Sequence, residues 1–140
     1  MRKILTNILF SIILLQFGCS VPAPSKEDFI GIWKSNDGGV FNFKDDNTFS
    51  AENLTGEKMF DGFQKYYGKK ITEKGKWYIK KEKDRWRLFL DFKKVEQSNG
   101  GHSTQLNIEG KNGVLLNKPP WVLFVWIGDP DDINKYEFTK

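Results

Sequence analysis

Few side chains in this sequence have the type and spacing that catalysis or metal binding requires. His102 is the only histidine and lies in a glycine-rich segment, and Cys19 is the only cysteine, so the chain lacks the ligand cluster of a zinc site. The remaining residues form no convincing phosphate-binding glycine loop, nucleophile elbow or Ser/His/Asp arrangement. We therefore expect a protein that is not an enzyme and that uses no cofactor and no metal ion.

Two further groups of residues have chemistry to offer. The acidic cluster Asp129-Pro130-Asp131-Asp132 carries oxygen atoms of the kind that Ca²⁺ accepts, but the EF-hand spacing and its distal Glu are missing. A Pro-Asp turn between the last two strands explains this cluster with fewer assumptions. The five Trp residues have ring faces that could stack on sugars or bases, although aromatic residues at strand spacing more often belong to a core.

The beginning of the chain has the pattern of an export signal. Arg2 and Lys3 form a short positive start, and residues 4–15 form an apolar stretch with the length of a secretory signal, too short to span a membrane. The segment Leu15-Gln16-Phe17-Gly18-Cys19 resembles a bacterial lipobox, in which a peptidase cuts before the cysteine and lipid is attached to its sulfur. It departs from the usual motif by placing Gln16, and not Leu, three residues before the cysteine. The alternative is an exported free or buried thiol after ordinary cleavage.

The lipobox resemblance divides the chain into three parts. It implies a signal peptide at residues 1–18, a lipidated Pro/Ser-rich tether at residues 19–26 and a folded domain at residues 27–140. Two or three acyl chains on Cys19 would hold the protein stably on a membrane. Ser20 follows the cysteine where Asp would mark retention, and by resemblance to enterobacterial lipoproteins this favours the outer membrane. We therefore expect a lipid-anchored protein of the bacterial cell envelope.

The charge of the chain gives no support to a nucleic-acid partner. Removing Arg2 and Lys3 from the 22 basic residues leaves 20, against 18 acidic residues, so the expected mature chain is close to neutral. Its Lys residues are interspersed with Asp and Glu, which is typical of a solvated surface of mixed charge.

The folded part reads as a series of short β-strands separated by turn signals. Asp37-Gly38-Gly39 and Asp45-Asp46-Asn47 are turns between alternating segments, and the hairpin of residues 76–81 and 86–92 follows later in the chain. After a loop at residues 97–101, a strand at residues 104–109 is followed by a tight turn and a short strand at residues 114–117, and residues 135–139 close the chain. Eight or nine such strands predict an all-β fold, a small antiparallel up-and-down barrel.

Residues 55–70 break this pattern. Their apolar residues are spaced by three and four, which predicts a short helix or lid, although Gly62 weakens the helix by about 1 kcal/mol relative to Ala. The segment is either a flap over a cavity mouth or a helix packed on the outer face of residues 121–127. Those seven consecutive apolar residues, Trp121-Val122-Leu123-Phe124-Val125-Trp126-Ile127, predict a central strand that is covered on both faces.

Several of these features together resemble small bacterial lipoproteins with lipocalin-like domains. The resemblance lies in the lipobox, in Gly31-Ile32-Trp33 at the start of the domain, in Gly75-Lys76-Trp77 and in the tail from Pro119 onward. Lipocalins often place an Arg from the last strand over the early Trp, whereas the last strand here offers only Lys135 or Lys140.

Two functions are compatible with such a barrel. One is a carrier that holds a small apolar molecule in its interior. The other is an interaction module, such as an envelope inhibitor or immunity protein, whose interior is filled and whose surface contacts a protein. An eight-stranded barrel is compatible with both. The residues expected either to line a ligand cavity or to form the core are Trp33, Phe41, Phe43, Trp77, Trp86, Leu88 and Leu90.

Overall fold

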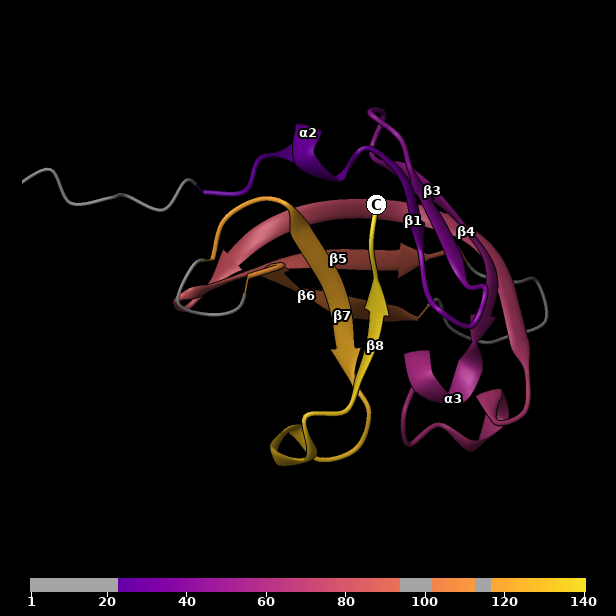
Figure 1. The fold of residues 1–140 in the computed structure, drawn as a ribbon. Coiled ribbons are helices and arrows are strands. Elements are labelled where there is room, and N and C mark those ends of the chain that lie inside the picture. The colour runs from indigo at the N-terminus through magenta and orange to yellow at the C-terminus, as the bar shows by residue number, and fades with distance from the viewer. Residues whose placement is uncertain (1–22, 94–101, 113–116) are drawn as a thin grey trace, which may run out of the picture.

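The computed structural model describes residues 23–93, 102–112 and 117–140, and β-strands dominate them (Figure 1). The strands are β1 (Gly31–Lys34), β2 (Val40–Phe43), β3 (Thr48–Thr55), β4 (Lys70–Glu82), β5 (Arg85–Phe92), β6 (Ser103–Gly110), β7 (Trp121–Trp126) and β8 (Lys135–Phe138). The helical segments are short: α2 (Lys26–Phe29), α3 (Gly56–Met59), η1 (Gln64–Tyr66) and η3 (Pro130–Asp132). The predicted signal peptide, Cys19, the loop at residues 97–101 and most of the turn and strand at residues 111–117 lie outside the described residues.

The eight strands form one antiparallel sheet in which each strand pairs with the next in the chain. The sheet curls until its two edges meet, and there the backbone groups of Lys34 and Thr139 exchange hydrogen bonds of 2.8 and 3.0 Å. The result is a nearly closed barrel, and the predicted all-β, up-and-down fold is confirmed. Closure matters physically because it removes most of the unpaired strand edge that would otherwise invite aggregation.

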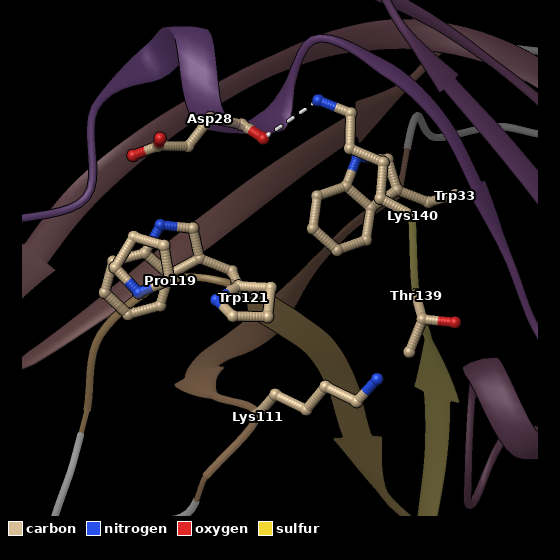
Figure 2. Close-up of a pocket in the computed structure, with 8 residues that line it drawn as sticks. Asp28, Trp33, Lys111, Pro119, Trp121, Thr139 and Lys140 are labelled. Atoms are coloured by element: carbon tan, nitrogen blue, oxygen red, sulfur yellow. Dashed lines mark hydrogen bonds between the residues drawn. The ribbon is translucent and has the colours of Figure 1, made fainter.

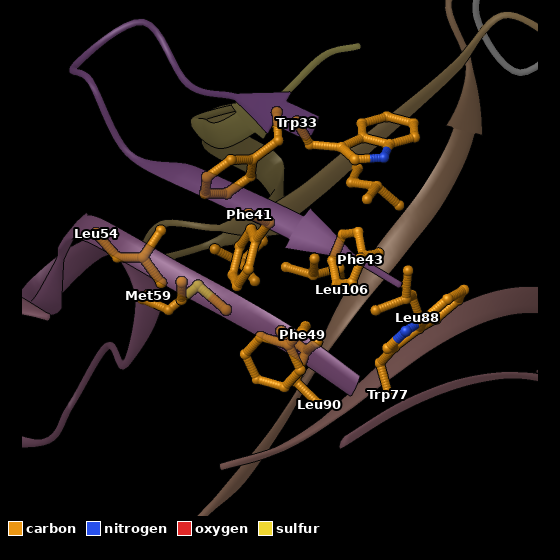
Figure 3. Packing of buried hydrophobic residues seen from close by; sticks show 14 of the residues in the cluster. Trp33, Phe41, Phe43, Phe49, Leu54, Met59, Trp77, Leu88, Leu90 and Leu106 are labelled. Carbon is orange, nitrogen blue, oxygen red and sulfur yellow. The ribbon is translucent and has the colours of Figure 1, made fainter. Parts of the chain in front are cut away.

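The interior of the barrel is built from the inward side of every strand (Figure 3). Period-two alternation places Trp77 of β4 and Leu88 and Leu90 of β5 on this side, while Tyr78 and Phe89 point outward and stack at 5.0 Å. That outward stack explains the one apolar residue of β5 that breaks the alternation. Gly75 has no side chain for a packing reason, since a Cβ there would lie 2.1 Å from the Asp91 carbonyl oxygen.

The segment expected to form a short helix or lid contains the short helix α3 and the 3-10 helix η1. α3 ends at Met59 and η1 begins at Gln64, and Gly62 between them adopts a left-handed backbone angle (φ +82°) that a continuous helix would not contain. Residue 70 already belongs to β4, which is much longer than the predicted strand of residues 76–81. The apolar residues of this segment do not form one helix face. Met59 and Phe60 are buried in the core, whereas Phe63 and Tyr67 are exposed.

The apolar run at residues 121–127 is strand β7 with Ile127 just beyond it. Trp121, Leu123 and Val125 join the core, and Phe124 on the opposite side is only 5% exposed. One interpretation of the sequence placed a helix on the outer face of this strand. At Phe124 that face is covered instead by the Lys135 side chain of β8, with Nζ 4.1 Å from the ring centroid. Helices long and apolar enough to cross a membrane are not found in the described part of the chain.

If this interior holds the barrel together, Trp77→Ala should lower the free energy of unfolding by roughly 3 to 5 kcal/mol, because it removes a buried ring and leaves a cavity. The adjacent Tyr78→Ala serves as the control, since Tyr78 is 45% exposed on the outer side, and it should cost less than about 1 kcal/mol. Urea unfolding of both variants makes the comparison. Similar losses for the two would contradict this packing.

Candidate functional site

The residues expected to line a cavity or form a core are brought together inside the barrel. Six of them are at most 1% exposed, and Trp86, at the start of β5, is partly buried and packs against the same cluster. Their rings contact one another and their neighbours: the centroids of Phe43 and Trp77 are 5.2 Å apart, and those of Phe41 and Phe43 are 5.3 Å apart. These side chains therefore occupy the space that they would otherwise surround.

One end of the barrel has a small pocket of about 160 Å³ between α2, the Pro119-Pro120 turn and the chain after β8 (Figure 2). The Lys140 side chain lies beside the Trp33 ring, with Nζ 6.0 Å from the ring centroid, and donates a 3.2 Å hydrogen bond to the Asp28 carbonyl. Of the two lysines Lys135 and Lys140, Lys140 is therefore the one beside Trp33, whereas Lys135 lies over Phe124. Trp33 itself donates to the Phe29 carbonyl at 2.8 Å, so α2, β1 and the end of the chain are linked here.

A polar network ties several elements together near α3. The Asp37 carboxylate accepts hydrogen bonds from Ser35 (2.6 Å), Thr55 (2.7 Å), Lys58 (3.0 Å) and the Tyr136 hydroxyl (3.0 Å). Burial would raise the pKa of Asp37, but these four donors outweigh it and hold the pKa well below its usual range. Gly39 leaves room for the network, since a Cβ there would lie 2.4 Å from the Tyr136 oxygen. A carboxylate held by four donors is suited to structural anchoring.

A second polar pair lies inside the barrel and was missed by sequence reasoning. Glu73 of β4 faces inward, and its Oε2 lies 3.4 Å from Nε2 of His102; both atoms are buried without a well-aligned hydrogen bond to the described residues. The His102 ring stacks on Phe92 at 4.8 Å and meets Phe60 edge-on at 4.9 Å. The available signal was alternation: a strand extended back from Trp77 to Ile71 puts Glu73 on the inward side.

Burial favours the neutral form of both side chains in this pair. It raises the pKa of Glu73, against the opposing effect of the Lys65 charge, and it lowers the pKa of His102, where Lys65 adds to the effect. Two such groups can share a proton. Groups of three or more His, Cys, Asp or Glu side chains suited to a metal ion do not occur in residues 23–93, 102–112 and 117–140.

The outer side of β6, β7 and β8 carries a larger groove of about 490 Å³. Phe124 and Trp126 of β7 meet edge to face at 5.1 Å, and Lys135 lies over both rings while its Nζ forms a 2.8 Å ion pair with Glu109. Trp86, one of the predicted residues, also lines this groove. The groove is therefore a rigid aromatic surface with charged and amide groups around it.

Ile133 lines the same groove and has an unusual backbone. It follows η3 with φ +54° and ψ +23°, the left-handed region that a β-branched residue rarely adopts, and its side chain is 75% exposed. The Asp129 side chain caps η3 by accepting from the Asp131 backbone N–H at 3.0 Å, so the acidic cluster forms the turn expected for it. An exposed apolar residue in a strained position suggests a role in binding, since folding gains little from it.

The Glu73–His102 pair predicts a pH-dependent stability. The raised Glu73 pKa contributes stability that is lost as the pH rises through its folded-state value, whereas the lowered His102 pKa contributes stability that is lost as the pH falls through its own. Glu73→Gln removes the first effect, so its advantage in Tm over the unmodified protein should grow from about pH 4 to about pH 8. The exposed Glu52→Gln is the control; a constant difference for Glu73→Gln would contradict the assignment.

Ile133→Asn should stabilise the protein by about 1 kcal/mol, because Asn tolerates the left-handed conformation and the exposed Ile side chain contributes little packing. Thermal unfolding is the measurement, and Ile133→Ala, which removes the β-branch without the special tolerance of Asn, should show a smaller gain. A Tm for Ile133→Asn at or below that of the unmodified chain would show that the position is not strained.

Comparison of the chain with protein-family models, with curated proteins and with solved structures finds no match. The interior offers a packed aromatic core and one buried acid-base pair, and the largest polar and aromatic concavity described above is on the outside.

Proposed function

We propose that this is a lipid-anchored protein of the bacterial cell envelope whose barrel is a packed scaffold and whose outer surface contacts its binding partner. The proposal adopts the interaction-module interpretation over the carrier interpretation. The observation that carries it is the contact among the interior rings, since a carrier of apolar molecules needs unfilled space at that place.

The place where the chain enters the folded domain is compatible with a lipid anchor on Cys19. Residues 19–25 precede α2, which packs on one end of the barrel through Phe29 and Trp33. Seven extended residues reach at most roughly 25 Å, so a lipidated Cys19 would keep the domain close to the membrane while leaving most of the barrel surface accessible. The packed interior and the anchor are independent parts of the proposal and are tested separately.

A packed interior predicts that an apolar fluorescent probe such as N-phenyl-1-naphthylamine will not bind saturably to the protein. Phe41→Ala is the positive control, because it opens space among rings that are otherwise in contact and should create a site if the probe can enter. Stoichiometric binding of the probe to the unmodified protein would favour a carrier instead.

The anchor predicts that Cys19→Ala will abolish labelling of the protein by a radioactive fatty acid and will release it from the membrane fraction. Because residue 19 precedes the folded domain, the variant should keep the Tm of the domain. Membrane retention that is unchanged in the variant would refute lipid anchoring at this residue.

A further inference from the structure

We propose that the groove on the outer side of β6, β7 and β8 binds an uncharged saccharide chain. This inference goes beyond the proposed function, because it gives the outer surface a saccharide ligand in addition to the protein partner of an interaction module. The groove has a volume of about 490 Å³, within the range of roughly 300 to 1,000 Å³ that is usual for small-molecule sites. Its lining residues are Asp84, Arg85, Trp86, Asn107, Ile108, Glu109, Asn117, Phe124, Trp126, Ile133 and Lys135.

The aromatic part of the groove is already fixed in place. Phe124 and Trp126 are two residues apart on one strand, so both side chains leave the same side of the sheet. Phe124 is almost fully buried and supports the partly exposed Trp126 edge to face, with an interplanar angle of 81°. Lys135 holds both rings, with Nζ 4.1 and 4.8 Å from their centroids. Because Lys135 covers one face of the Trp126 ring, a sugar would stack on the part of this ring that stays exposed, with little further loss of side-chain freedom.

The polar part of the groove favours a ligand rich in hydroxyl groups. The Oδ1 atom of Asn117 accepts a 2.8 Å hydrogen bond from the Gly110 backbone N–H, and the NH₂ group of Asn117 takes no part in that bond. Asn107 donates a long 3.4 Å hydrogen bond to the Phe124 carbonyl. Amide and carboxylate groups beside an aromatic ring match a molecule that has one apolar face and a rim of hydroxyls.

The charge of the groove decides against other ligand classes. The two acidic residues, Asp84 and Glu109, balance the two basic residues, Arg85 and Lys135, and Glu109 and Lys135 are paired with each other at 2.8 Å. A nucleic acid or another polyanion needs a surplus of positive charge, which this lining does not have. An acyl chain needs an enclosed apolar site, whereas this groove has charged and amide side chains along it. The balanced charge and the aromatic and amide side chains of the lining match an uncharged amphipathic polymer, and a saccharide chain has that chemistry.

The test is a titration of the full-length protein, kept in detergent, with three uncharged tetrasaccharides: the β-1,4-linked N-acetylglucosamine tetramer, cellotetraose and maltotetraose. Tryptophan fluorescence and isothermal calorimetry measure binding. At least one sugar should bind saturably, and Trp126→Ala should weaken that binding roughly tenfold, the loss expected when a stacked ring is removed. Tyr78→Ala is the matched control, because Tyr78 is an exposed aromatic residue on the outer side that does not line the groove, and it should leave the affinity unchanged.

Asn107→Ala provides a second variant that leaves the aromatic rings in place, and it should also weaken binding, so the test does not depend on the folding of Trp126→Ala. The inference is overturned if none of the three sugars binds, or if Trp126→Ala or Asn107→Ala binds them as well as the unmodified protein does. If no sugar binds, the proposal of a packed barrel interior still stands. Saturable binding of the apolar probe by the unmodified protein would contradict the packed interior but not sugar binding in the groove.

Discussion

The contacts among aromatic rings inside the barrel are the interaction on which the rest of this structure depends. Phe41 lies within 6 Å, ring centroid to ring centroid, of Phe43, Phe49 and Phe138, and so connects β2 to β3 and to the final strand. Each fully buried ring stabilises the fold by roughly 1.5 to 3 kcal/mol relative to an exposed one. Because β1 and β8 meet only through the bridge between Lys34 and Thr139, the shared core holds the sheet curled as much as its hydrogen bonds do.

Because aromatic rings fill the interior, most of the polar groups that could bind a ligand lie at the ends and on the outside of the barrel. The Asp37 network fixes the chain near α3, and the Glu73–His102 pair lies between β4 and the start of β6 under the rings of Phe60 and Tyr66. On the outside, Lys135 keeps the rings of Phe124 and Trp126 in place, and Ile133 remains exposed in a conformation that disfavours it. These surface features, with the small volume of the pocket beside Trp33, are the basis for locating binding outside.

Much of the fold could be predicted because period-two alternation and turn residues are local signals. They identified the hairpin of β4 and β5, the inward placement of Trp77, Leu88 and Leu90, and the antiparallel up-and-down arrangement of the strands. The segment around Met59 was predicted as a short helix or lid, and a short helix is present as α3, but its end at Met59 could not be predicted because the spacing of the apolar residues does not show the left-handed backbone at Gly62. The Glu73–His102 pair joins residues 29 positions apart, so alternation gives the inward side of Glu73 but no local pattern gives its partner. The choice between a hollow and a filled barrel required the three-dimensional contacts.

The central claim is that the barrel interior is a packed core and carries nothing. Native mass spectrometry of the protein purified from its own membranes, before and after organic extraction, tests this most directly. The account predicts a mass that extraction leaves unchanged, because the only added groups would be covalent acyl chains. A stoichiometric extra mass that extraction removes would contradict it and would identify a carried molecule within the barrel.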